Sequence, residues 1–119
     1  MNKLLLCGLF LFSSSVFALK ITVDIAMKYK DIAIEERCSI DAHEIVKFIH
    51  TPIIITVQNY EEAYDRALIA VKVQSESNGR RTLLAKPVLL VDSENPAQLT
   101  LNGAIKDALT MLEIRAKCN

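Results

Sequence analysis

The protein has 119 residues, a length that fits one domain rather than two. Its 14 Lys and Arg are balanced by 14 Asp and Glu, which excludes the usual case for nucleic acid, because phosphate binding needs a basic surplus. Aromatic residues make up 6% of the chain, so few rings are available to stack on bases or sugars.

Residues 1–18 have the pattern of a secretory signal peptide. Lys3 provides a short positive segment, residues 4–12 are an apolar run, and small residues precede a cleavage site after Ala18. The apolar run is shorter than the ~20 residues that a membrane span needs. We therefore expect a mature domain over residues 19–119, periplasmic or secreted, with no membrane span after signal removal.

The first half of this domain alternates between apolar and polar residues, which is the pattern of half-buried strands. Residues 21–29 alternate most cleanly, and residues 32–40 follow after a polar pair. In the second of these strands Glu36 interrupts the apolar parity, and Cys38 falls on the inward face. Residues 53–57, a β-branched run, are a further short strand.

Residues 41–50 are compatible with two structures. Asp41 and Glu44 have the spacing of a capping box, and the apolar residues that follow have helical spacing. The same segment could be a strand with Val46 and Phe48 on one face. Pro52 ends either element.

Residues 59–68 are also compatible with two structures. Their apolar residues have the spacing of an amphipathic helix, but the segment could equally be a loop that leads into a strand. We favour a loop over 59–65 and a strand over 66–75. Asn78-Gly79 is a strong hairpin signal, and a hairpin requires an extended first arm.

The returning strand of that hairpin, residues 82–91, contains Pro87, which cannot donate to a ladder and so predicts a sheet edge or a bulge. Beyond it we expect a turn at 92–96, a strand over 97–101, a turn at Asn102-Gly103 and a last strand over 110–118.

Six or seven short strands separated by turns predict an all-β domain, a small antiparallel sandwich or barrel. The alternative is an α+β domain with one or two short helices near 41–50 and 59–68.

Cys38 and Cys118 are the two cysteines of the mature chain, and each shares the parity of the apolar residues in its strand. In an oxidising compartment we expect them to form one disulfide. The loop that it would close is long, so the chain-entropy model assigns it about 4 kcal/mol of stability.

Candidate chemistry is sparse. His43 and His50, with Asp41 and Glu44 nearby, are too far apart for the usual helical metal pair, and we expect no metal. The chain has no Gly-x-Ser-x-Gly elbow and no glycine-rich phosphate loop, so we predict neither an enzyme nor a cofactor.

Two features favour protein contact. The strand with Pro87 offers a possible edge for strand addition, along Thr82, Leu84, Lys86 and Val88. Tyr60 and Tyr64 lie among acidic residues and form a possible contact patch.

The second half of the chain places a Lys-Pro pair in one strand, then an acidic turn, then a strand that starts with alanine. From Ala85 to Leu101 this order resembles small exported β-domains of Gram-negative envelope proteins and, locally, strands of secretin domains. The resemblance implies an all-β envelope domain. It implies no channel, because the chain is too short to build a pore.

These features together predict a non-catalytic exported protein that acts through contact with an unknown protein partner. One alternative is a secreted effector or inhibitor that acts on a host or competitor. Another is a small hydrolase or metal-binding protein.

Overall fold

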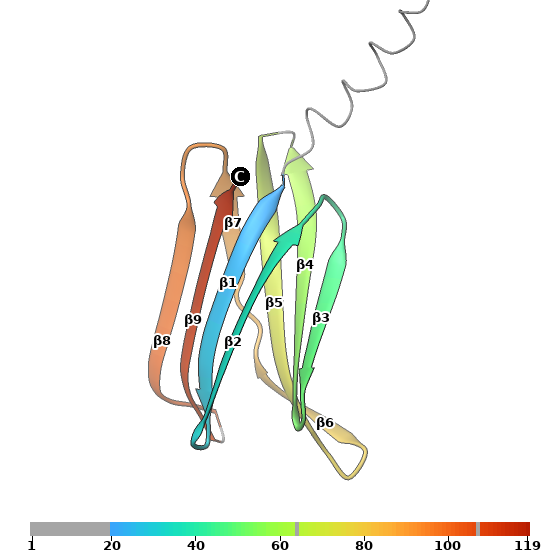
Figure 1. Ribbon diagram of the computed structural model, residues 1–119, viewed down its shortest axis with the longest axis vertical. Helices are drawn as coiled ribbons and strands as arrows, with labels where there is room; N and C mark the ends of the chain where they lie inside the picture. Colours follow the sequence, from blue (N-terminus) through green and yellow to red (C-terminus); the bar gives the residue numbers. More distant parts are fainter. Residues whose placement is uncertain (1–19, 64, 107) are drawn as a thin grey trace, which may run out of the picture.

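The computed structural model describes residues 20–119 except residues 64 and 107 (Figure 1). This part of the chain is a β-sandwich-like arrangement of two antiparallel sheets, which confirms the predicted all-β class. The predicted signal peptide lies outside the described residues. Within them, no helix has the length and apolarity needed to cross a membrane.

The first sheet has four strands in the order β2-β1-β9-β8, so the first and last of the described strands are neighbours at its centre (Figure 1). Its strands are β1 (Ile21–Tyr29), β2 (Ile32–Ile40), β8 (Ala97–Lys106) and β9 (Leu109–Cys118).

The second sheet has five strands, and two of them share one edge. Its order is β3-β4-β5-β6, and β7 also pairs with β5. The strands are β3 (Ile45–His50), β4 (Ile53–Ala63), β5 (Arg66–Ser77), β6 (Arg80–Ala85) and β7 (Val88–Asp92).

The returning strand, predicted as one element over residues 82–91, is instead divided at Pro87 into β6 and β7. β6 pairs with Val73–Ser77 of β5 and β7 with Arg66–Ala70. Between them the Pro87 carbonyl accepts a hydrogen bond from the Val71 amide at 3.0 Å. Pro87 therefore lies at a sheet edge. Proline has no N–H to donate, and at this position the sheet does not require one.

The core lies between the sheets and is built from alternate residues of every central strand. On β1 the inward positions are at most 8% exposed, and the intervening residues are more exposed. The same alternation occurs on β4, β5 and β9. The largest fully buried side chains are aliphatic: Ile21, Met27, Ile40, Ile53, Ile55, Ile69, Leu109, Leu112 and Ile114.

Residues 41–50 form a turn and a strand, not a helix. The Asp41 amide donates to Glu44 Oε1 at 2.8 Å, so the capping-box contact exists, but it closes a turn. Strand β3 follows, with Val46 and Phe48 packed against the core, as in the strand interpretation. The segment has local preferences for both helix and strand, and its pairing with β4 selects the strand.

The predicted loop over residues 59–65 is wrong for residues 59–63, and residue 64 lies outside the described residues. Strand β4 continues to Ala63, and Tyr60 pairs with Leu68 of β5 before a register shift near the end of the hairpin. The predicted turn at Asn102-Gly103 is also wrong, because both residues lie within β8. Gly103 has a φ of 93° and sits where the β8–β9 register shifts, so its glycine-specific backbone marks an irregularity rather than a chain reversal.

One polar side chain interrupts the core. Asn59 on β4 is fully buried, and neither amide atom of its side chain has a hydrogen-bond partner among the described residues. Leaving such a buried group unpaired costs about 1–3 kcal/mol.

We therefore expect Asn59→Leu, which keeps nearly the same shape, to raise the free energy of unfolding by about 1–3 kcal/mol. Urea denaturation followed by circular dichroism measures this change. Asn59→Ala is the control, because it removes the amide and also leaves a cavity, so its gain should be smaller. A loss of stability in the leucine variant would contradict the prediction.

Candidate protein-binding face

The outer surface of the five-stranded sheet carries a group of neighbouring apolar side chains. No other part of the described chain covers this group. Tyr60, Val88 and Leu90 are 47%, 56% and 53% exposed, respectively. The strand register brings these residues together: Leu68 stands between Tyr60 and Leu90, and Ala70 is next to Val88. We call Tyr60, Leu68, Ala70, Val88 and Leu90 the apolar face.

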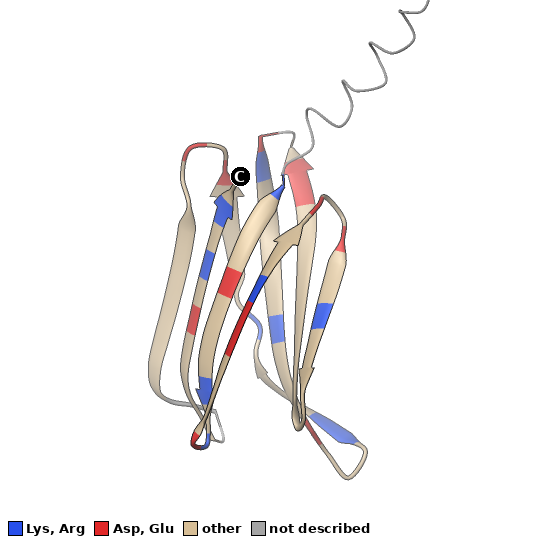
Figure 2. Ribbon diagram, in the orientation of Figure 1, with Lys and Arg blue, Asp and Glu red and all other residues tan. Residues whose placement is uncertain are grey.

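The charges beyond the Ala70 end of the apolar face are positive. Lys72 lies two residues after Ala70 on β5, and it is paired with Thr56 of β4. Lys47 of β3 is paired with Thr56 from the other side, so both lysines lie on the outer surface of the sheet. Neither lysine forms an ion pair within the described residues. Figure 2 accordingly shows blue bands at the middle of β3 and of β5, with a tan stretch of β4 between them and a red end of β4 beyond it. This part of the surface has unpaired positive charge beside exposed apolar area.

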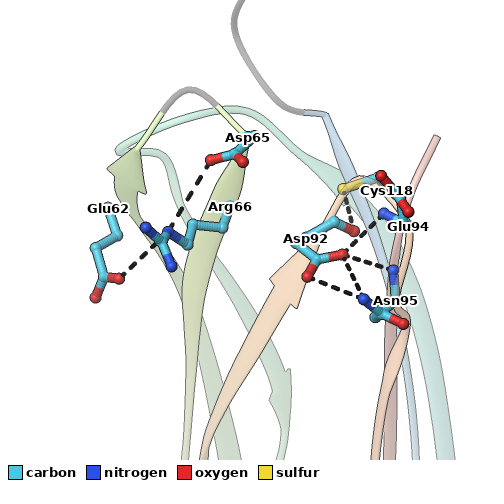
Figure 3. A network of polar contacts seen from close by, with 7 residues as sticks. All are labelled: Glu62, Asp65, Arg66, Asp92, Glu94, Asn95 and Cys118. Carbon is cyan, nitrogen blue, oxygen red and sulfur yellow. Dashed lines mark hydrogen bonds and ion pairs between the residues drawn. The ribbon is translucent and has the colours of Figure 1, made fainter.

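Acidic groups lie at one end of this sheet and have partners there (Figure 3). Arg66 Nε lies 3.9 Å from Glu62 Oε1 and 4.0 Å from Asp65 Oδ1. Asp92 Oδ1 accepts hydrogen bonds from the amides of Glu94 and Asn95, at 2.8 and 2.6 Å. The Asn95 side chain, followed by these amides, lowers the pKa of Asp92, which keeps the turn's carboxylate ionised.

On the outer surface of the four-stranded sheet the arginines are paired with carboxylates, although Lys28 and Lys117 form no ion pair within the described residues. Arg37 Nε and Nη2 contact the two carboxylate oxygens of Asp24 at 2.5 and 3.2 Å. The Arg37 hydrogen bond lowers the pKa of Asp24. Arg115 donates to Glu113 at 3.2 Å on the same surface. A partner would have to break these pairs, so we do not choose this surface as the binding site.

The sequence-predicted edge residues do not share one surface. Leu84 is buried and Thr82 half-buried, while Lys86 lies exposed between β6 and β7. Val88 faces outward within the apolar face. The break at Pro87 explains this division, because the register against β5 changes between the two strands.

Of the predicted tyrosine patch, Tyr60 belongs to the apolar face, with its hydroxyl donating to Gln58 at 2.8 Å. Tyr64 lies outside the described residues. Sequence reasoning missed Leu68 and Leu90. Their signal was available, since both are apolar residues at the outward parity of their strands, but the register that joins them to Tyr60 is set by pairing between distant segments.

The predicted disulfide is not present: Cys38 and Cys118 are both free. Both do face the core, as their parity indicated. However, Cys38 pairs with Val23 on one side of β1, and Cys118 with Ile21 on the other side. Strands two positions apart are about 10 Å apart, whereas disulfide-bonded residues have Cα atoms about 4.4–6.8 Å apart. The alternation of apolar residues indicated that both cysteines face inward. It could not show that β1 lies between their two strands.

The two histidines lie at opposite ends of β3. His43 is exposed in the turn before the strand, and His50 ends it, roughly 20 Å away at the rise of an extended chain. His50 Nε2 lies 2.5 Å from Glu36 Oε2 of β2, so this contact joins the two sheets. No group of three or more potential metal ligands occurs among the described residues.

Comparisons of the chain with protein-family models, with curated proteins and with solved structures found no match. The candidate site therefore rests on the geometry described above.

The cysteines provide a chemical test of the fold. Burial raises the pKa of Cys38 to about 11, and burial also raises the pKa of Cys118. The thiolate is the reactive form, so at pH 8 only about one thousandth of Cys38 is reactive.

We expect iodoacetamide to modify both cysteines without reductant, with the rate at Cys38 rising about tenfold per pH unit between about pH 7 and 10. Peptide mapping by mass spectrometry assigns the label to each residue, and free cysteine is the control. Complete resistance of both residues until a reductant is added would contradict the structure.

Proposed function

We propose that this protein is a non-catalytic exported domain that acts by protein–protein contact, and that the apolar face is its contact surface. The observation that carries the proposal is the exposure of Tyr60, Val88 and Leu90 on one sheet surface, where Leu68 connects Tyr60 to Leu90. Contiguous exposed apolar groups on a folded domain mark interaction sites. The signal-peptide pattern and the resemblance to envelope domains support a periplasmic or extracellular location.

The chemistry of the face defines the partner that fits it. Tyr60 offers a rigid ring with a polar end, a combination enriched at protein interfaces. Lys72, two residues after Ala70 on β5, adjoins the face without a carboxylate of its own among the described residues. The complementary surface therefore has apolar side chains at its centre and a carboxylate on the side that meets Lys72.

We expect Leu90→Glu to weaken capture of the partner more than about tenfold, because it places a charge within the apolar contact. Lys72→Glu should weaken it less, and more strongly at low salt. The measurement is quantitative affinity capture from envelope fractions and culture supernatant, with each variant's fold checked by circular dichroism.

Thr100→Glu is the matched control, because Thr100 is exposed on the outer surface of the other sheet. A partner captured equally by the Leu90 variant and the wild type would contradict the proposed surface. Co-sedimentation with phosphatidylglycerol vesicles, together with no protein captured, would replace a protein partner by an anionic lipid surface.

A further inference from the structure

Strand β3 has a free edge. It pairs with β4 along its whole length, from Ile45–Gln58 to His50–Ile53, and no other described strand pairs with it. In Figure 1 it is the outermost strand of its sheet. The backbone groups on its other side are therefore available to a further strand.

The other sheet edges carry features that discourage strand addition. β2 has three consecutive charged residues, and one of them, Glu36, turns inward to His50. β6 and β7 share one edge, which begins with Arg80 and Arg81, is broken at Pro87 and ends in the five-residue β7. β8 has a register irregularity after Asn102. Charges, inward-pointing charged residues, proline and bulges are the devices that protect natural edges.

β3 has much less protection. Its sequence is Ile-Val-Lys-Phe-Ile-His, which has high β-propensity and one permanently charged residue. On its outer side Ile45 and Ile49 are 56% and 67% exposed, and Lys47 stands between them. Ile49 is the most exposed large apolar side chain among the described residues. On the inner side, Val46 and Phe48 are only half-buried against the core.

Lys47 indicates which strand fits this edge. Two copies of β3 paired about Lys47 would bring like charges opposite each other, which is unfavourable. A strand with a carboxylate at that position would instead form a cross-strand ion pair. Directly opposite residues project from the same side of a sheet, so the occupant's flanking outer residues would meet Ile45 and Ile49.

We propose that the free edge of β3 binds an extended segment of a partner protein whose outer side chains read apolar, acidic, apolar, and whose inner side chains are apolar. The inner side chains extend the core beside Val46 and Phe48. The pattern is the same in both directions, so it holds for parallel and antiparallel addition. This edge is separate from the apolar face, and its proposal does not depend on the function assigned to that face.

The probe is a capped peptide, Thr-Ile-Val-Glu-Val-Ile-Thr, joined to a Gly-Ser tail for solubility. A second peptide has Lys in place of Glu. We expect the Glu peptide to bind the 15N-labelled protein roughly tenfold more tightly than the Lys peptide, since one pairs opposite charges and the other like charges. The amides of residues 45–50 should show the largest shifts and slower hydrogen exchange.

The variant Lys47→Glu should reverse this preference. Lys72→Glu is the matched control, because it makes the same charge change on the same side of the sheet two strands away, and it should leave the preference unchanged.

Three results would overturn the proposal. The first is equal affinity for the two peptides, or no binding of either. The second is binding mapped to β2, β6 or β8, or to the apolar face with loss in the Lys72 variant. The third is dimerisation through β3 in analytical ultracentrifugation without peptide, which would make a second copy the occupant.

Discussion

The structure depends on one apolar layer shared by two sheets. The inward positions of β1 and β9 in one sheet meet those of β4 and β5 in the other, and together they form a single buried cluster. A shift of one residue in any of these strands would turn its apolar residues to solvent and its polar residues into the layer. Register is thus fixed by burial, and the positions of the outer side chains follow from it.

That dependence explains what the sequence could and could not predict. The alternation over residues 21–29, the Asn78-Gly79 turn and the edge position of Pro87 are local signals, and the structure agrees with each. Asn59 was misread because it is a polar turn-former that lies at a fully buried position. Tertiary pairing with β5 keeps it in a strand against its local preference.

The candidate site and the cysteines illustrate the same limit. Parity identified Cys38 and Cys118 as inward-facing, and it could have identified Leu68 and Leu90 as outward-facing. Parity does not give the order of strands in a sheet. The order separates the cysteines by β1 and joins the outer leucines to Tyr60. Both the absent disulfide and the apolar face are therefore properties of topology.

The two outer surfaces differ in exposed apolar area, while each carries both ion pairs and unpaired lysines among the described residues. On the four-stranded sheet, guanidinium and carboxylate groups neutralise one another, as Arg37 and Asp24 do. On the five-stranded sheet, lysines without acidic partners adjoin exposed apolar residues. The second arrangement leaves both charge and apolar area for another molecule to complement, and this asymmetry supports the proposed function.

The central place of β9 has a consequence for how the chain is made. β9 is the last of the described strands, yet it lies between β1 and β8 and holds them in one sheet. A polypeptide that emerges with its N-terminus first cannot assemble this sheet until β9 has emerged. Until then the hairpin of β1 and β2 has one apolar surface uncovered, and exposed apolar surface of this kind makes folding intermediates prone to aggregate.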